Sequence, residues 1–257
     1  MITCRILTYS KAFDGLGCCR RRHSFPQGGI SEISKTSFWS MSLNLIENYN
    51  LDVNYVGNPL LDEINKKDYK FTYKYSKSII GLFPGSRKQE IDSIFPEMLK
   101  VVDNYPNYQF VVACSNILSK EYYQSFIKNK NVILVFNETY GLLKNAKVAL
   151  VTSGTATLEA ALFKVPQVVC YKTNWLTYFT AKFLLKINSI SLVNIILKKD
   201  VVKELIQGDL NKKNLIKELD IILDTKKDLI KDYETLLNIL NKKEASSNAA
   251  KFIISSF

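Results

Sequence analysis

Residues 151–160 combine a turn of small residues with the start of a helix, and this arrangement can bind an anion. The segment reads Val-Thr-Ser-Gly-Thr-Ala-Thr-Leu-Glu-Ala and follows the apolar run at 147–150. The free N–H groups and positive dipole end of a helix N-terminus favour a phosphate, and Gly154 lets a ligand approach the backbone closely. Ser153, Gly154 and Thr155 are therefore candidate phosphate-binding residues, although such residues also form ordinary loop-to-helix turns.

A second turn of the same kind follows a strand candidate upstream. The run at 78–83 is apolar, and Pro-Gly-Ser-Arg-Lys-Gln-Glu at 84–90 precedes residues with helical spacing. In an open parallel sheet, ligands bind outside the carboxyl ends of the strands, which is where both turns should lie. Arg87 adds a permanent fork of donors suited to phosphate oxygens, and Ser86 adds a hydroxyl. The two turns together predict phosphate binding more strongly than either does alone.

The elements that must position these turns follow from the spacing of apolar residues. Strands are expected at 79–83, 108–114, 131–136, 147–151 and 166–171. Helices are expected at 90–104, 118–129, 138–145, 155–163, 174–186 and 198–207, with three more between 212 and 255. Pro96 should interrupt the first helix and restart it, because proline is tolerated best in a first turn. This alternation predicts an α/β fold: a parallel sheet with helices on both faces and extra carboxy-terminal helices.

Four motifs, taken in order and spacing, resemble those of the lipid-A-disaccharide synthase family. They are Tyr-Val-Gly-Asn-Pro-Leu-Leu-Asp at 55–62, Leu-Phe-Pro-Gly-Ser-Arg-Lys-Gln-Glu-Ile at 82–91, Thr-Ser-Gly-Thr-Ala-Thr-Leu-Glu at 152–159, and Ser-Leu-Val-Asn at 191–194 with Val-Lys-Glu-Leu-Ile-Gln at 202–207. The match runs from about residue 50 to the end. The resemblance implies a Rossmann-like domain at 51–257 that is the donor-binding half of a GT-B glycosyltransferase fold.

The resemblance also implies a reaction. Enzymes of this family transfer 2,3-diacylglucosamine from UDP-2,3-diacylglucosamine to 2,3-diacylglucosamine 1-phosphate and release UDP, in lipid A biosynthesis. The family's other half, which should carry the acceptor site and the catalytic acid/base residues, has no counterpart in this sequence. The catalytic residues therefore stay unknown, and we expect the chain alone to be inactive. Two alternatives remain open: a noncatalytic UDP-sugar-binding remnant, and another GT-B enzyme such as a UDP-N-acetylglucosamine epimerase.

The matched motifs assign roles in donor binding. Ser86 and Arg87 would contact the diphosphate, with the amides of the 153–155 turn as the second set of donors. Glu159 would accept hydrogen bonds from the ribose hydroxyls, or it would only complement the helix dipole. Asn194 and Gln207 would bind phosphate or sugar; the alternatives are turn stabilisation for Asn194 and an exposed helix position for Gln207.

Neither a metal ion nor another cofactor is expected. An Asp-x-Asp carboxylate pair does not occur in the chain. Helix dipoles and arginine should then stabilise the charge that grows on the leaving diphosphate. The family's usual histidine is replaced by Asn58 and its usual proline by Val193, so any proton transfer at position 58 is in doubt. His23, the only histidine, lies outside the matched region.

Residues 1–50 resemble the family poorly. Cys-Cys-Arg-Arg-Arg-His at 18–23 and Pro-Gln-Gly-Gly at 26–29 show neither strand alternation nor a helical stripe. This segment is either a disordered tail or the product of a shifted reading frame. The DNA immediately upstream of Met1 would decide whether the missing half is encoded there.

The net charge and the cysteines bear on which binding partners and which kinds of site to expect. The net charge is +11, but the lysines of 198–243 fall on the polar faces of predicted helices, and no nucleic-acid-binding signature accompanies them. We expect no nucleic acid, and a nucleotide-sugar donor and an acylated acceptor as partners. The five cysteines are odd in number and lack paired spacing, which excludes a disulfide scaffold and a zinc site. Cys114 and Cys170 are expected to be small core residues.

The chain should be cytoplasmic, with peripheral contact at the inner membrane. The sequence lacks a signal-peptide core and an apolar run of the roughly 20 residues that a membrane span needs. The segment Trp-Leu-Thr-Tyr-Phe-Thr-Ala-Lys-Phe-Leu-Leu-Lys at 175–186 is either a membrane-touching amphipathic helix or, as we favour, a core helix. The oligomeric state does not follow from the sequence.

Overall fold

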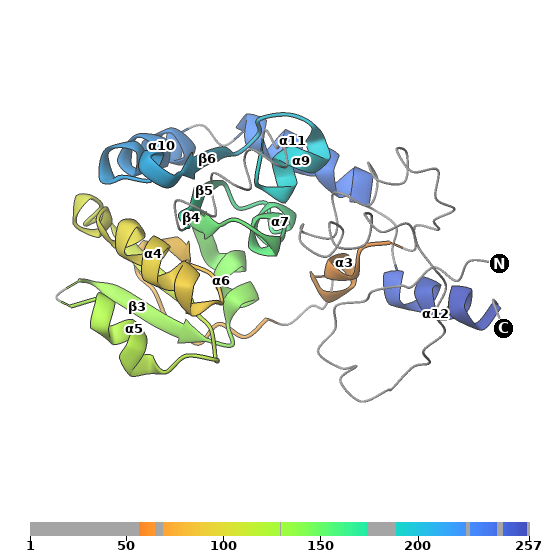
Figure 1. The fold of residues 1–257 in the computed structure, drawn as a ribbon, viewed down its shortest axis with the longest axis horizontal. Helices are drawn as coiled ribbons and strands as arrows, with labels where there is room; N and C mark the ends of the chain where they lie inside the picture. The colour runs from red at the N-terminus through yellow and green to blue at the C-terminus, as the bar shows by residue number, and fades with distance from the viewer. Residues whose placement is uncertain are drawn as a thin grey trace, which may run out of the picture. The chain divides into compact units, whose positions relative to one another are not determined.

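The protein is described here from a computed structural model, which describes residues 57–64, 69–128, 130–173, 189–224, 227–240 and 244–255. The chain divides into two units, Met1–Tyr55 and Val56–Phe257, and the second is described by itself. Its centre is a six-stranded sheet in the order β3-β2-β1-β4-β5-β6 (Figure 1). The strands are β1 (Ser78–Phe83), β2 (Tyr108–Cys114), β3 (Val132–Phe136), β4 (Ala146–Thr152), β5 (Gln167–Tyr171) and β6 (Lys203–Ile206). The first five lie where the sequence predicts them.

All strand pairs in the sheet are parallel. From β1 the chain runs outward to β3 and then returns to β4 on the other side of β1. The strand order therefore reverses between β1 and β4. In folds of this class the crevice at such a reversal, outside the carboxyl ends of the strands, is the usual ligand site.

The described helices cover both faces of the sheet. They are α3 (Pro59–Ile64), α4 (Lys88–Leu99), α5 (Lys120–Phe126), α6 (Thr139–Asn145), α7 (Thr155–Leu162), α9 (Leu192–Leu197), α10 (Lys212–Asp224), α11 (Lys227–Leu240) and α12 (Ala245–Ser255). Short 3-10 turns lie at Val102–Asn104 and Gln207–Asp209. The three carboxy-terminal helices, α10 to α12, fall between 212 and 255 as predicted.

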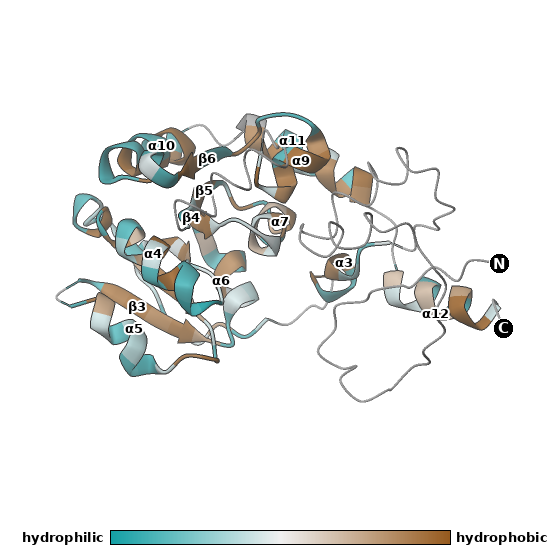
Figure 2. Cartoon of the chain, in the orientation of Figure 1, coloured by the Kyte–Doolittle hydropathy of each residue, from teal (hydrophilic) through white to brown (hydrophobic). Residues whose placement is uncertain are grey.

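Successive strand residues face opposite layers of helices, as the two-residue period of a strand requires. Ile80 and Leu82 of β1 pack in one core with residues of α4, α5 and α10. Ile79 and Phe83 pack in another core with residues of α6 and α7. A third cluster joins α3, α7, α9 and α11. Strands buried on both faces, such as β1, are apolar almost throughout. The edge strand β3 is only partly buried but is also apolar, and it is brown along its length in Figure 2.

Two sequence predictions are wrong. The helix predicted at 198–207 is absent from those residues: α9 ends before Lys198 (φ +50°), and strand β6, which pairs with β5, lies in the predicted range. Helix α4 does not restart at Pro96 but continues through it. Phe95 and Met98 near the proline are fully buried, which holds this part of the helix in place. Pro96 has no N–H to donate to the carbonyl of Asp92, but Asp92 is exposed, so water can take that place. The predicted helix at 174–186 lies outside the described residues.

Candidate nucleotide-binding site

The two turns singled out in the sequence lie next to each other in the fold. Phe83 at the end of β1 is the register partner of Val151 in β4. A Cβ atom placed on Gly85 would lie 3.3 Å from Cγ2 of Thr152. The turn after β1 and the turn after β4 therefore meet at the point where the strand order reverses, as an anion site in this fold requires.

The first turn presents an available cation. The Arg87 side chain is 82% exposed, and its Nη1 lies 3.5 Å from Oε1 of Glu90, a contact at the limit of hydrogen bonding. Arg87 is also the N-cap of α4 and makes no side-chain cap, so the first N–H groups of the helix are left for another acceptor. Ser86 beside it is exposed.

Glu90 shapes the same turn. Its Oε2 lies 2.5 Å from the position that a Cβ on Gly85 would occupy, and Gly85 has φ +106°. Both the space and the backbone angle therefore demand glycine here. The carboxylate of Glu90 occupies part of the space above the turn and shares Arg87 with any incoming phosphate.

The second turn is open and uncapped. Gly154 is the N-cap of α7, with φ +134° and ψ −156°, and no side chain caps the helix. A Cβ atom on Gly154 would have no neighbour within 4 Å. Thr155 is exposed, whereas the Ser153 hydroxyl already donates to the carbonyl of Ile190 over 2.9 Å. Ser153 can therefore serve a phosphate through its backbone N–H more readily than through its hydroxyl hydrogen.

Glu159 lies one turn further along α7 and is half-buried. Burial raises the pKa of its carboxyl, while the hydrogen bond from the Tyr140 hydroxyl, at 3.3 Å, acts in the opposite direction. A carboxylate that has lost part of its water is a strong acceptor. The arrangement suits a carboxylate that accepts hydrogen bonds from ligand hydroxyls.

Asn194 and Gln207 use their amide groups within the protein. Both amide hydrogens of Asn194 and both lone pairs of its oxygen are engaged, with the carbonyl of Val202, Oε1 of Glu204 and the N–H groups of Val201 and Val202. Gln207 pairs through both amide atoms with the backbone of Thr173. The prediction that these two residues bind sugar or phosphate stays a prediction, and these contacts do not favour it. Gln207 begins the 3-10 turn after strand β6 and is half-buried, so it is not at an exposed helix position.

The part of the chain that matches a known protein family includes these candidate residues. A family model described as lipid-A-disaccharide synthetase matches residues 43–256. The chain belongs to the lipid-A-disaccharide synthetase family. All of the candidate residues named above lie within the matched range.

Curated relatives of this family cover the chain in part. The lipid-A-disaccharide synthase of Syntrophus aciditrophicus is 36% identical over 174 residues, which are 63% of this chain and 45% of that protein. That of Sulfurihydrogenibium sp. is 35% identical over 179 residues, 61% of this chain and 46% of that protein. The chain therefore spans about half the length of the curated relatives it matches.

A solved structure supports the fold of the family member. A protein named as a UDP-N-acetylglucosamine 2-epimerase from Listeria monocytogenes superposes with a TM-score of 0.51 and 17% identity, over 79% of this chain and 53% of that one. At this identity the likeness concerns the fold alone. The predicted Rossmann-like sheet, one half of a GT-B fold, is confirmed.

The position that departs from the family pattern has a structural role. Asn58 is 1% exposed, and its Oδ1 accepts a hydrogen bond from the N–H of Leu60 at the start of α3. This is an N-cap, a role that asparagine fills well. Cys114 and Cys170 are buried core residues as predicted, and burial raises the pKa of the Cys114 thiol to about 12.

A separate hollow of about 310 Å³ lies beside the start of α6. It is lined by Glu63, Tyr69, Lys70, Asn137, Glu138, Thr139, Tyr140 and Gly141. None of the predicted phosphate-binding residues lines it, and its link to the site is Tyr140, which reaches Glu159. Sequence reasoning missed Tyr140, because nothing in the sequence spacing brings α6 and α7 together.

Three further observations concern the described residues only. No three His, Cys, Asp or Glu side chains among them are grouped closely enough to hold a metal ion. None of their helices combines the length and apolar composition needed to cross a membrane. The segment at 175–186, the region 1–50 and His23 lie outside the part of the chain that the structure describes.

Proposed function

We propose that this chain binds the UDP-sugar donor of a lipid-A-disaccharide synthase. The observation that carries the proposal is the meeting of two uncapped helix starts, α4 and α7, at the strand-order reversal, with the exposed guanidinium of Arg87 beside them. Two neighbouring helix N-termini and one arginine would provide the positive potential that a diphosphate needs. Membership of the family identifies which diphosphate ligand to expect.

In the proposed reaction, 2,3-diacylglucosamine passes from UDP-2,3-diacylglucosamine to 2,3-diacylglucosamine 1-phosphate, and UDP leaves. Negative charge grows on the β-phosphate as the glycosidic bond breaks. Arg87 and the backbone N–H groups of the two turns would stabilise that charge without reorganising. Glu159 would accept hydrogen bonds from the ribose hydroxyls, which fixes the nucleotide along α7.

The acceptor site and the acid/base groups would come from the half of the enzyme that the matched relatives have in addition. The acylated substrates would be drawn from the cytoplasmic face of the inner membrane, where we propose peripheral contact. A remnant that binds UDP-sugars without turnover would use the same donor site, and a GT-B epimerase would also bind a UDP-sugar there.

Calorimetric titration of the chain with UDP tests the proposal, with UMP and uridine as matched ligands that lack one or both phosphates. We expect affinity to fall from UDP to UMP to uridine, since the site is built around the phosphates. Repeating the UDP titration with EDTA should leave binding in place. Equal binding of UDP and uridine, or loss of UDP binding in EDTA, would contradict the arginine-and-dipole site.

A further inference from the structure

Residues 190–207, which include α9 and β6, are hydrogen-bonded to the elements that carry the two turns. We propose that Glu204 and Gln207 are positioning residues, which hold the turns in place without contacting the nucleotide. The inference rests on the proposed function, because it concerns how the same UDP site is held. It gives Asn194 and Gln207 a role different from the ligand contacts predicted by the sequence.

Glu204 fixes the start of α9. Its carboxylate accepts hydrogen bonds from the N–H of Ile190 at 3.0 Å, the N–H of Ser191 at 2.9 Å and Nδ2 of Asn194 at 2.9 Å. A carboxylate that only accepts is matched here by three donors. The Oδ1 atom of Asn194 accepts in turn from the N–H groups of Val201 and Val202, just before Glu204 in the chain. The segment 190–204 is thereby closed on itself.

This closed segment reaches both sides of Gly154. The Ser153 hydroxyl donates to the carbonyl of Ile190 over 2.9 Å. The N–H of Leu192 donates to Oγ1 of Thr157 over 3.3 Å, and that hydroxyl donates to the carbonyl of Gly154 over 2.8 Å. The second phosphate turn is therefore held through the residues that Glu204 fixes.

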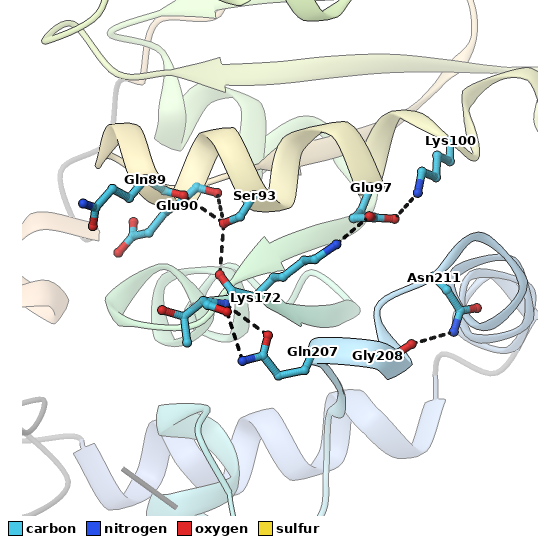
Figure 3. A network of polar contacts seen from close by, with 10 residues as sticks. Gln89, Glu90, Ser93, Glu97, Lys100, Lys172, Gln207, Gly208 and Asn211 are labelled. Carbon is cyan, nitrogen blue, oxygen red and sulfur yellow. Dashed lines mark hydrogen bonds and ion pairs between the residues drawn. The ribbon is translucent and has the colours of Figure 1, made fainter. Parts of the chain in front are cut away.

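Gln207 is connected to helix α4, which follows the other turn. The N–H of Thr173 donates to its Oε1 over 3.2 Å, and its Nε2 donates to the carbonyl of Thr173 over 3.1 Å. The neighbouring Lys172 contacts α4 twice (Figure 3): its carbonyl lies 3.0 Å from Oγ of Ser93, and its Nζ lies 2.7 Å from Oε1 of Glu97. Helix α4 is the helix that Arg87 begins.

Direct ligand contact would cost these residues their present bonds. Gln207 would have to release two backbone groups of Thr173, and Asn194 would have to release four partners, some of them buried. Unpaired buried polar groups are expensive. The geometry therefore points to two chains of hydrogen bonds that start at or just after the edge strand β6. One runs from Glu204 to the turn at 153–154, and the other runs from Gln207 to α4.

Glu204→Gln and Gln207→Ala separate the two connections. The first replaces one carboxylate oxygen with an NH₂ group that faces a backbone N–H. Each variant should weaken UDP binding by about 2- to 10-fold, the effect of one ordinary hydrogen bond. Their effects should multiply when combined, because they act on different turns. Ser93→Ala lies on the Gln207 connection, so adding it to Gln207→Ala should weaken binding little further.

Asp209→Asn is the matched control for Glu204→Gln, since it makes the same change of charge at an exposed position five residues along. It should leave UDP affinity unchanged. If Gln207 touched the nucleotide directly, one of two results is expected. Ser93→Ala alone would leave UDP affinity unchanged, or the losses of affinity from Ser93→Ala and Gln207→Ala would multiply in the double variant. Either result would overturn the proposed connection.

Amide hydrogen exchange without nucleotide tests the same claim independently of UDP binding. Glu204→Gln should speed exchange at 153–157 more than at 88–93, and Gln207→Ala should do the reverse. A uniform increase at both turns, or no local increase, would reject positioning. If the unmodified chain fails to bind UDP, the proposed function is wrong, and the exchange pattern alone then decides the positioning claim.

Discussion

Arg87 is the residue on which the candidate site depends most. Its guanidinium is largely exposed, and among the described residues it makes one long contact, with Glu90. An arginine in this state retains most of its donors for a ligand. The other charged groups near the first turn are more strongly engaged: Lys88 lies 2.6 Å from Asp92, for example.

We predict that Arg87→Ala weakens UDP binding by about 1.5 to 3 kcal/mol, the range for a hydrogen bond to a charged group. Calorimetry measures the change. Lys77→Ala removes the same charge just before β1, at the opposite end of that strand, and should leave affinity nearly unchanged. An equal loss in both variants would mean that net charge, and not a specific contact, attracts the nucleotide.

Glu159 gives a prediction about pH. Because burial raises its pKa in the folded protein, the ionised carboxylate destabilises the fold. This penalty is absent below the unfolded pKa and grows as pH rises through the folded pKa. Glu159→Gln should therefore melt at a higher temperature than the unmodified protein at pH 7, and the difference should disappear near pH 4.

The same Glu159→Gln variant should bind UDP more weakly at pH 7, because a neutral amide is a poorer acceptor for ribose hydroxyls. Thermal melts at both pH values and one titration at pH 7 suffice. A variant that is more stable and binds UDP as well as before would leave Glu159 without a role in binding.

At the residue scale, sequence reasoning located groups better than it assigned their roles. The types and positions of Arg87 and Gly154 were enough to place them in turns, because local chain geometry dictates those turns. The role of Gln207 depends on the backbone of Thr173, 34 residues away, and that of Asn194 depends on how the chain folds back at 201–204. The spacing of neighbouring residues does not predict which groups the fold brings into contact with these side chains.

Among the elements, the turn before α7 makes the sharpest demand on sequence. Gly154 has a backbone conformation that is essentially restricted to glycine, although nothing crowds its Cβ position. A side chain at this position would strain the backbone angle without clashing with a neighbouring atom. A substitution there tests the backbone alone.

We predict that Gly154→Ala lowers the free energy of unfolding by about 1 to 3 kcal/mol, the cost of a strained backbone angle. Gly208→Ala is the matched control, because its Cβ would also meet nothing within 4 Å and its backbone does not have a positive φ of that kind. It should change stability by less than about 0.5 kcal/mol. Urea denaturation distinguishes them, and equal losses would refute the strain argument.

The strand prediction succeeded for the longer apolar runs, including the edge strand β3, and failed for the short edge strand β6. Strands β1 to β5 are apolar runs long enough to recognise. Strand β6 has four residues, exposes Lys203 and pairs on one side only, with β5. A strand so short carries too few apolar positions to reveal its period, so its tertiary partner decides its conformation.

On the scale of the whole molecule, the chain corresponds to about half of each curated relative. Its described part contains the proposed donor site, and a glycosyl transfer would also need an acceptor held opposite the sugar. The last turn of α12, brown in Figure 2, exposes Phe252, Ile253 and Ile254. Exposed apolar side chains of this kind fit a surface that further structure would cover.

We predict that the 257-residue chain on its own shows no turnover with UDP-2,3-diacylglucosamine and 2,3-diacylglucosamine 1-phosphate. UDP release should stay at background, while an intact relative at the same concentration is active. Binding of UDP by the same preparation shows that it is folded. Turnover by this chain alone would place the acid/base residues within it.

The strand order also has a consequence for how the protein is made. The central strand β1 pairs on one edge with β2, which starts at Tyr108, but its other partner, β4, starts only at Ala146. Until the ribosome has added the 62 residues between Phe83 and Ala146, the backbone groups of that second edge lack their native partner, in a strand whose side chains are almost all apolar. An open apolar edge is a template for pairing with other chains. The central position that sets β1 beside the proposed phosphate site therefore makes it the strand most in need of protection during synthesis.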